Sequence, residues 1–249
     1  MPPHDRKASE QRFHDDRYAD ETRADLDKYY AVMQRSLGLF RQLAREASRG
    51  ADVLEYGCGA QPHSLEVARD ARSVHGIDIS PVAIEQARAS ATAEGLDRFE
   101  FTVGDAESLD FPDDSFDLVF GSAIVHHLEI DRALRDVARV LRPEGRALFI
   151  EPLGHNPLIN LYRSRTPELR TPDEHPLRLD ELELAASFFR EHDYRYFHFF
   201  SLASVPFRSS RLFEPLLAGL DAADRALFTV GPARRLAWYV VMVLDRPRA

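Results

Sequence analysis

Two glycines at the end of a short apolar segment constrain this sequence more than any other feature. The segment begins with Val53 and Leu54, Gly57 and Gly59 end it, and a helical pattern starts at Ser64. Because glycine has no Cβ, such a strand–glycine–helix unit lets the backbone approach a ligand closely. The N–H groups that begin the following helix can bind a negatively charged group. The segment therefore predicts a binding loop.

An acidic residue stands at an informative distance from this loop. Asp78 follows a second apolar segment and comes about 20 residues after Gly57. In βαβ units that bind nucleosides, an acid at this distance accepts hydrogen bonds from the ribose hydroxyls. The alternative role for Asp78 is a helix cap. Loop and acid together favour a cofactor that contains a nucleoside.

The motifs present and absent narrow the choice of cofactor. A Gly-x-Gly-x-x-Gly dinucleotide fingerprint would need glycine at position 62, where Pro62 stands, and there is no phosphate-binding Gly-x-x-x-x-Gly-Lys-Ser/Thr run. The motifs that do occur, in this order, are Glu55-x-Gly57-x-Gly59, Asp78, Gly104-Asp105-Ala106 and Ser115-Phe116-Asp117-Leu118-Val119. Over about residues 50–152 this order closely resembles the class I S-adenosylmethionine (SAM)-dependent methyltransferases, and most of all those of ubiquinone and menaquinone biosynthesis. Gln61 departs from the family, which often has a third glycine there.

The resemblance implies SAM as the cofactor and a role for each matching residue. It implies that Gly57 and Gly59 approach the methionyl end of SAM, with Glu55 supporting their loop. The roles that it implies for the remaining positions are ribose binding by Asp78, an adenine contact by Ile79, adenine-edge contacts by Asp105 and Ala106, and a place beside the methionyl group for Ser122. Asp117 falls at the start of its strand, away from the ligand edge, and is assigned to structure.

Composition excludes several classes of partner and location. The chain has 249 residues, a net charge of −9 and a pI of about 5.6, which argues against binding nucleic acid through its phosphates. The apolar run at 237–244 is too short to span a bilayer, and the charged N-terminal region does not resemble a signal peptide. The lone cysteine, Cys58, allows no intrachain disulfide. We expect a cytoplasmic protein without stable membrane insertion; a homodimer is compatible with the sequence, which does not give the oligomeric state.

Apolar segments and helical patterns alternate along most of the chain. Strands are predicted at 73–78, 99–103, 116–121, 146–150, 195–201 and 237–244, and helices after Ser80-Pro81, at 131–141, at 179–189 and twice within 207–235. Such alternation predicts a parallel sheet with right-handed crossovers, whose ligands gather at the carboxyl ends of the strands. With the resemblance, this implies an α/β fold: a Rossmann-like, doubly wound, mostly parallel seven-stranded sheet whose last strand is antiparallel.

The predicted domain organisation is one SAM-binding domain with additions. An N-terminal helical cap covers 1–49, and the methyltransferase domain covers 50–249 with substrate inserts at about 153–178 and 207–235. Within the cap, apolar residues recur at helical spacing from Tyr18 to Ala47. The helix packs on the sheet edge, and in enzymes of this kind N-terminal aromatics often cover the cofactor. Tyr18, Tyr29 and Tyr30 are the candidates for that cover, and Tyr29 is the one chosen as a cofactor-binding residue. An aromatic face near a sulfonium gains about 0.5–2 kcal/mol.

Two histidines and a polar insert are candidates for acting on the acceptor. His126 and His127 follow the fourth strand, and a histidine can take a proton from a hydroxyl or amine near neutral pH. The alternative is a histidine bonded to the backbone at a helix start, and the two side chains cannot both face the same way. The predicted substrate-binding residues are Glu151, His155, Asn156, Arg170 and His175. The spacings of His126, His155, Glu174 and His175 match no known metal cage, and we expect no metal.

These features predict methyl transfer from SAM to a small acceptor, at oxygen, nitrogen or carbon. The apolar residues of 207–235, with arginines interleaved, favour a hydrophobic, quinone- or lipid-like acceptor or a secondary metabolite. Action at a membrane surface is a weaker form of this hypothesis, because the net charge of −9 opposes binding to anionic lipid. Two alternatives are a SAM-binding interaction module without catalysis and a nicotinamide-dependent reductase; Pro62 counts against the reductase.

Overall fold

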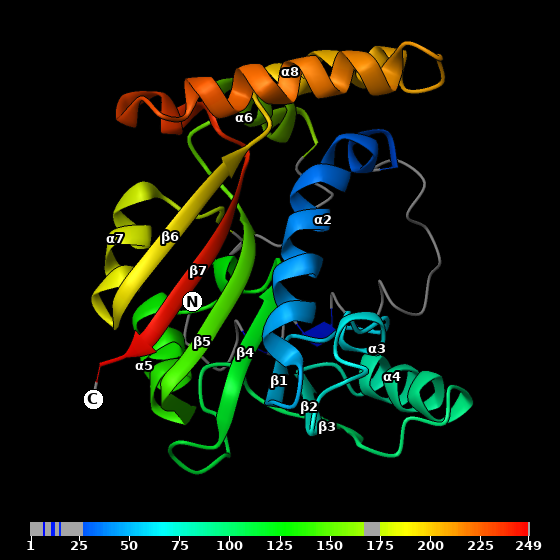
Figure 1. The fold of residues 1–249 in the computed structure, drawn as a ribbon, viewed down its shortest axis with the longest axis vertical. Helices are drawn as coiled ribbons and strands as arrows, with labels where there is room; N and C mark the ends of the chain where they lie inside the picture. The colour runs from blue at the N-terminus through cyan, green and yellow to red at the C-terminus, as the bar shows by residue number, and fades with distance from the viewer. Residues whose placement is uncertain (1–6, 8–10, 13–14, 16–26, 167–174, 249) are drawn as a thin grey trace.

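The computed structural model describes residues 7, 11–12, 15, 27–166 and 175–248, and of residues 27–30 only the helical backbone. Its centre is a seven-stranded sheet in the order β3-β2-β1-β4-β5-β7-β6 (Figure 1). The strands are β1 Asp52–Tyr56, β2 Ser73–Asp78, β3 Phe99–Val103, β4 Phe116–Ser122, β5 Leu141–Pro152, β6 Phe189–Phe197 and β7 Tyr239–Pro247. Strands β1 to β5 pair in parallel, and β7 runs antiparallel to both β5 and β6. This confirms the predicted Rossmann-like sheet and its antiparallel last strand.

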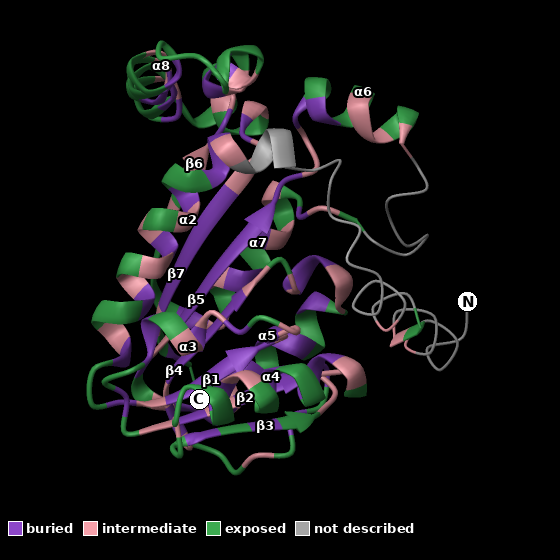
Figure 2. Ribbon diagram, turned by 90° about the vertical axis from the view of Figure 1, so that its right-hand side faces the viewer, coloured by how far each residue is buried: buried purple, intermediate pink, exposed green. Residues whose placement is uncertain are grey.

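Helices cover both faces of the sheet (Figures 1 and 2). They are α2 Asp27–Ser48, α3 Ser64–Val67, α4 Pro81–Ala93, α5 Ile130–Val140, α6 Pro157–Arg165, α7 Leu179–Ser187 and α8 Phe213–Leu227, with short 3-10 helices η1 Val125–His127, η3 Phe200–Phe207 and η4 Gly231–Leu236. Helices α2, α3 and α4 pack on one face of the sheet, and α5 and α7 pack on the other.

The two faces of the strands supply two apolar cores, because side chains alternate along a strand. In β7, for example, Met242 packs into the core beneath α5 and α7, whereas Val241 and Val243 pack into the core beneath α2. On the second face, Phe40 of α2 lies against Phe120 of β4, with ring centroids 6.0 Å apart. Burial on both faces explains why the central strands are apolar throughout.

The start of α4 follows the predicted signal. Ser80 is the N-cap, and its hydroxyl oxygen accepts a hydrogen bond from the backbone N–H of Ala83 at 3.1 Å. Pro81 occupies the first helical position, where its missing N–H costs nothing. Together these residues start α4 directly after β2, so the carboxyl end of β2 and the first turn of α4 lie next to each other.

Strand β5 begins earlier than predicted. The sequence placed its start at Arg146, but the strand begins at Leu141, which pairs with Phe116 of β4 before a shift in register. Arg142 holds this extension, since its guanidinium forms ion pairs with Asp117 at 2.7 Å and Asp52 at 3.0 Å. The intervening Pro and Gly, which suggested a turn, lie within the strand.

The prediction of a strand at 195–201 is wrong in its second half. Strand β6 covers Phe189–Phe197, and η3 begins at Phe200. Strand β6 is the edge strand, so charged residues occur along it and hide the apolar alternation. The segment 207–235, predicted to hold two amphipathic helices, contains one long helix, α8, followed by the short η4.

The insert at 153–178 is more regular than expected. It contains α6, whose N-cap Asn156 accepts hydrogen bonds from the N–H groups of Leu158 and Ile159. Arg170, predicted to bind substrate, and Tyr18 lie outside the described residues. Tyr29 lies in the first turn of α2, and its side chain is likewise outside the description.

Helices α6, η3, α8 and η4 gather beyond the carboxyl ends of β5 and β6, at one end of the molecule (Figures 1 and 2). The connection from β6 is held by His198, whose Nε2 lies 2.8 Å from the Ser36 hydroxyl of α2. Burial lowers the pKa of His198 to about 3, so the ring is neutral. The carboxylate of Asp224 in α8 accepts hydrogen bonds from the N–H groups of Phe199, Phe200 and Ser201. Among the helices of the described ranges, none has the length and apolar character to cross a membrane.

Candidate functional site

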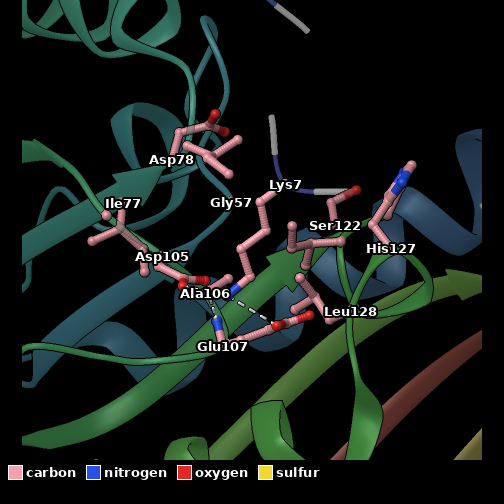
Figure 3. Close-up of a pocket in the computed structure, with 14 residues that line it drawn as sticks. Lys7, Gly57, Ile77, Asp78, Asp105, Ala106, Glu107, Ser122, His127 and Leu128 are labelled. Atoms are coloured by element: carbon pink, nitrogen blue, oxygen red, sulfur yellow. Dashed lines mark hydrogen bonds and ion pairs between the residues drawn. The ribbon is translucent and has the colours of Figure 1, made fainter. Parts of the chain in front are cut away.

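A pocket opens at the carboxyl ends of β1, β2 and β4, where the strand order reverses direction. This is the edge of the sheet at which open α/β folds bind ligands. The pocket brings together seven residues selected from the sequence, which are Gly57, Asp78, Ile79, Asp105, Ala106, Ser122 and His127. In Figure 3, Asp78 and His127 lie on opposite sides of the pocket, and Lys7 reaches between them.

The glycine loop at the end of β1 requires its glycines. Gly57 has φ 69° and Gly59 has φ 61°, in the left-handed region that favours glycine. A Cβ atom on Gly57 would lie 2.7 Å from Cγ1 of Ile124, so any side chain there would displace the pocket wall. The backbone of β1 can therefore border the pocket directly.

Asp78 is held in place by the backbone of its own surroundings. Its Oδ2 accepts a hydrogen bond from the N–H of Gly59 at 2.9 Å, and its Oδ1 accepts one from the N–H of Ser80 at 2.9 Å. Each carboxylate oxygen has two lone pairs, so both retain capacity for a further donor. The side chain is half-buried and lines the pocket. The Asp78 carboxylate can therefore accept hydrogen bonds from two hydroxyl groups of a ligand.

Glu55 plays a different part from Asp78, although both belong to the same motif. Its two oxygens accept hydrogen bonds from the N–H groups of His63 at 2.7 Å and Ser64 at 3.0 Å, at the start of α3. The side chain is buried and does not line the pocket. Burial raises the pKa of Glu55 to about 7, against the lowering effect of these hydrogen bonds. Glu55 ties the loop to α3 and has no direct path to a ligand.

The segment after β3 places two carboxylates at the pocket. Oδ1 of Asp105 accepts a hydrogen bond from the N–H of Glu107 at 2.9 Å, and Oε1 of the buried Glu107 accepts one from the N–H of Glu129 at 2.9 Å. The carbonyl of Ala106 accepts the hydroxyl hydrogen of Tyr56. These contacts fix the backbone around Asp105 and Ala106.

Lys7 enters this pocket from the N-terminal region. Its ammonium lies 2.5 Å from Oδ2 of Asp105 and 3.0 Å from Oε2 of Glu107 (Figure 3). Burial opposes the charge on Lys7, but its hydrogen bonds to the two carboxylates outweigh burial and raise its pKa. Nothing in the sequence singles out Lys7, because it lies in a polar stretch without apolar spacing. Glu107 could have been noticed as the second acid after Gly104.

The two adjacent histidines have different surroundings, although their ring centroids lie only 4.2 Å apart. His126 is buried, and its Nδ1 lies 2.7 Å from Oε2 of Glu151, while Oε1 of Glu151 accepts hydrogen bonds from the N–H groups of Ile124 and Val125. His127 is half-buried and lines the pocket. The structure therefore brings only His127 to the pocket, because the short η1 helix turns His126 toward the carboxylate inside.

Most residues predicted to bind substrate are engaged elsewhere. Glu151 is fully buried, and both of its carboxylate oxygens are in contact with η1 or with the residue just before it. Asn156 caps α6 and donates to the carbonyl of Leu236 at 2.6 Å. Nε2 of His155 accepts a hydrogen bond from the N–H of Leu179, and His175 pairs with Glu181 at the surface. None of these four lines the pocket.

The same site offers no metal-binding cluster or reactive thiol among the residues placed by the structure. No group of three or more His, Cys, Asp or Glu side chains in the described ranges could hold a metal ion. Cys58 is buried within the glycine loop, and burial raises the pKa of its thiol well above the usual range. Its side chain packs into the core beneath α2.

Comparison with known proteins agrees with this geometry. Residues 54–149 match the family model described as a methyltransferase domain. An uncharacterized methyltransferase of Bacillus subtilis (strain 168) is 34% identical over 122 residues, which make up 48% of each chain. Aklanonic acid methyltransferase of Streptomyces sp. (strain C5) is 42% identical over 112 residues, 43% of this chain and 51% of that protein. The chain thus spans about half the length of these curated relatives.

A solved structure matches across the full length. Geranyl diphosphate C-methyltransferase from Streptomyces coelicolor A3(2), crystallised with Mg²⁺, geranyl diphosphate and S-adenosyl-L-homocysteine, superposes with a TM-score of 0.69 at 12% identity. The match covers 99% of this chain and 100% of that chain. At this identity the likeness concerns the fold.

The residues of the pocket fit the cofactor of this family. The open backbone at Gly57 admits a close ligand, Asp78 has acceptor capacity for two hydroxyls, and Ile79 offers an apolar surface beside it. Of the motifs that carry the resemblance, Gly57, Asp78 and Gly104-Asp105-Ala106 line one pocket within the matched segment 54–149, whereas Glu55 and the Ser115–Val119 motif do not. Residues 54–149 thus carry a class I S-adenosylmethionine-dependent methyltransferase domain.

Proposed function

We propose that this protein transfers a methyl group from SAM to a small hydrophobic acceptor, at oxygen, nitrogen or carbon. The observation that carries the proposal is the pocket itself. A fixed carboxylate at Asp78, an open glycine loop at Gly57 and a histidine at His127 border one cavity at the ligand edge of the sheet. When SAM is bound, its sulfonium supplies an electrophilic methyl group.

Each side of the pocket takes one part of the cofactor. Asp78 accepts hydrogen bonds from the ribose hydroxyls, and Ile79 packs against the adenine. The carboxylate of Asp105 and the backbone N–H of Ala106 face the adenine edge. The loop at Gly57 and the end of β4 at Ser122 border the methionyl group. Fixing the donor in this way supplies alignment, which is worth effective molarities of about 10⁵–10⁸ M in well-oriented reactions.

His127 is the proposed general base. It lines the pocket beside Ser122, on the side away from Asp78 (Figure 3). A neutral imidazole there can accept the proton that an acceptor hydroxyl or amine loses as it attacks the methyl group. The buried contact between His126 and Glu151 fixes the turn that presents His127.

The acceptor is proposed to be hydrophobic because apolar side chains line part of the pocket and pack in the elements beyond it. Ile77, Ile124 and Leu128 line the pocket. The end of the molecule above it is formed by η3 and α8, whose inner residues Phe213 and Leu217 pack against α2. The name of the similar aklanonic acid methyltransferase gives an acceptor of this kind for that protein.

Conversion of SAM to S-adenosylhomocysteine by the purified protein tests the proposal. We expect turnover with an organic-solvent extract of cells that depends on both protein and extract, and a mass increase of one methyl group in an acceptor. Binding of SAM without any turnover would instead favour an interaction module. Binding of a nicotinamide cofactor in place of SAM would favour the reductase.

Asp78→Ala should weaken SAM binding by tenfold or more. Hydrogen bonds to a charged group contribute about 1.5–3 kcal/mol each, and this carboxylate faces the proposed ribose position. Isothermal titration calorimetry measures the effect, with Asp97→Ala as an exposed control. Asp78→Asn removes the charge but keeps one carbonyl oxygen, which can accept from the N–H of either Gly59 or Ser80, so comparing the two variants separates loss of the charge from loss of the side chain. Unchanged SAM affinity in both Asp78 variants would exclude the ribose role.

Lys7→Met should tighten SAM binding by about two- to fivefold. The ammonium of Lys7 occupies Oδ2 of Asp105, the oxygen proposed to accept from adenine, and a partly exposed ion pair is worth about 0.2–1 kcal/mol. Removing Lys7 frees this acceptor. Lys28→Met, in the same N-terminal region, serves as a comparison in the calorimetric titration. Weaker binding by Lys7→Met would mean that Lys7 supports the cofactor.

A further inference from the structure

The end of the molecule beyond the strands carries an unusual share of the exposed apolar side chains. We call this region the cap end, formed by α6, η3, α8, η4 and the loops that join the last three. Eight large apolar side chains are exposed in the described part of the chain, and six of them belong to the cap end. These six are Leu158, Leu161, Phe200, Phe207, Leu212 and Val230.

These side chains lie at the tips of the cap end. Phe207 and Leu212 flank the loop between η3 and α8, which projects at one end of α8 (Figure 1). Val230 lies beyond the other end of α8, just before η4. Leu212 is 63% exposed and Leu158 of α6 is 56% exposed, which is far above the exposure of a core residue. Apolar groups presented so fully to solvent mark an interaction surface.

Basic side chains accompany each apolar tip. Arg208 and Arg211 stand between Phe207 and Leu212 in a fully exposed stretch of six residues. Arg234 and Arg235 follow Val230, and both are exposed. In α6, Arg163 and Arg165 follow Leu158 and Leu161. The same pairing of apolar and basic groups thus occurs three times at one end of the molecule.

The acidic residues of this region turn inward. Asp221 is buried and pairs with Arg35 of α2 at 3.2 Å. Asp224 is buried and accepts three backbone N–H groups at the start of η3. Between residues 199 and 236, all of them described, Glu214 is the single acid left exposed. The fold therefore removes negative charge from the surface that bears the arginines.

Local charge governs what this surface attracts. The whole chain has a net charge of −9, which by itself would oppose an anionic partner. At physiological salt, however, charges separated by more than about 8 Å are largely screened. Helix α8 has 15 residues and is about 22 Å long, which exceeds this screening distance. A partner at the cap end therefore interacts mainly with the charges of the cap end and little with the negative charge on the rest of the chain.

We propose that the cap end docks on an anionic lipid bilayer surface. The exposed Phe207, Leu212 and Val230 enter the interface between headgroups and acyl chains, and the neighbouring arginines contact lipid phosphates. This combination of apolar and basic side chains is how peripheral proteins bind anionic membranes. It is a surface contact and requires no spanning helix. The proposal does not depend on the methyl-transfer reaction, because none of these side chains lines the pocket.

Sedimentation with lipid vesicles tests the proposal on the full chain. The wild-type protein should bind vesicles of phosphatidylcholine mixed with phosphatidylglycerol and should bind pure phosphatidylcholine at least tenfold more weakly. Arg208→Glu/Arg211→Glu should lower the partition constant on the mixed vesicles at least tenfold. Phe207→Ser/Leu212→Ser should do the same, and raised salt should weaken wild-type binding.

Matched variants at the other end of the molecule provide controls. Arg132→Glu/Arg190→Glu makes the same change in net charge at exposed sites of α5 and β6, and Leu184→Ser removes an exposed apolar group from α7. Both should bind like the wild type, and circular dichroism should show every variant folded. The proposal would be overturned if Arg132→Glu/Arg190→Glu weakened vesicle binding as much as Arg208→Glu/Arg211→Glu does, or if the wild-type protein did not bind the mixed vesicles. It would also be overturned by sedimentation equilibrium showing a dimer that Phe207→Ser/Leu212→Ser dissociates while vesicles are not bound, since the occupant would then be a second copy.

Discussion

Replacing His127 with alanine is expected to lower kcat by about 10²–10⁴-fold while SAM affinity changes little. His127 is the histidine that lines the pocket, whereas its neighbour His126 is buried against Glu151. An acceptor hydroxyl or amine that attacks the sulfonium methyl group must lose a proton, and no other imidazole borders the described pocket. Loss of the base therefore affects the chemical step more than cofactor binding.

Initial rates of S-adenosylhomocysteine formation at saturating SAM measure this effect, together with calorimetric SAM affinity. His192→Ala provides a control, because His192 is exposed on the edge strand β6. His127→Gln should not restore the rate, since an amide is not a base. Near-normal turnover in His127→Ala would show that the acceptor attacks without a general base, as an activated carbon or a soft nucleophile can.

The cofactor side of the pocket was predictable because its determinants are local in sequence. The turn at Gly57 needs glycine for a positive φ and for close contact with Ile124. Asp78 ends a strand, and Ser80 with Pro81 starts the next helix, so the chain itself places the carboxylate at the sheet edge. A fixed spacing within one βαβ unit is enough to specify such a site.

The rest of the pocket lining was not predictable, because it depends on contacts between distant residues. Which of two adjacent histidines faces the pocket is decided by Glu151, which is 25 residues away from His126. Lys7 reaches Asp105 across 98 residues, from a stretch without any periodic pattern. No spacing rule links such pairs, so the sequence could nominate both histidines but could not choose between them.

The roles of the polar residues in and beside the insert were also not predictable from the sequence. Asn156, His155 and Glu151 were selected because they follow a strand that ends at the ligand edge. The structure uses each of them to satisfy backbone groups, in a helix cap, a helix start and a buried turn. Polar groups at strand ends serve either ligands or the backbone, and only the packing around them distinguishes the two uses.

Glu151 is expected to be a positioning residue whose loss affects both stability and the pocket. Its side chain is fully buried, and it accepts the N–H groups of Ile124 and Val125 at 3.0 and 2.9 Å while contacting His126. Removing it leaves these partners without an acceptor inside the protein, and each buried unsatisfied group costs about 1–3 kcal/mol. The turn that they belong to presents Ile124 and His127 to the pocket.

Glu151→Ala should therefore lower the free energy of unfolding by about 3–5 kcal/mol, the usual cost of breaking a buried charged contact. Glu151→Gln keeps one carbonyl acceptor and should lose less. Denaturation by urea measures both, with Glu144→Ala as a control, because Glu144 is an exposed partner of Arg246 whose loss should cost less than about 1 kcal/mol. If Glu151→Gln is as stable as the wild type but turns over SAM more slowly, the carboxylate acts through the orientation of the histidine turn. If Glu151→Ala costs no more than Glu144→Ala, the buried carboxylate does not hold this wall of the pocket.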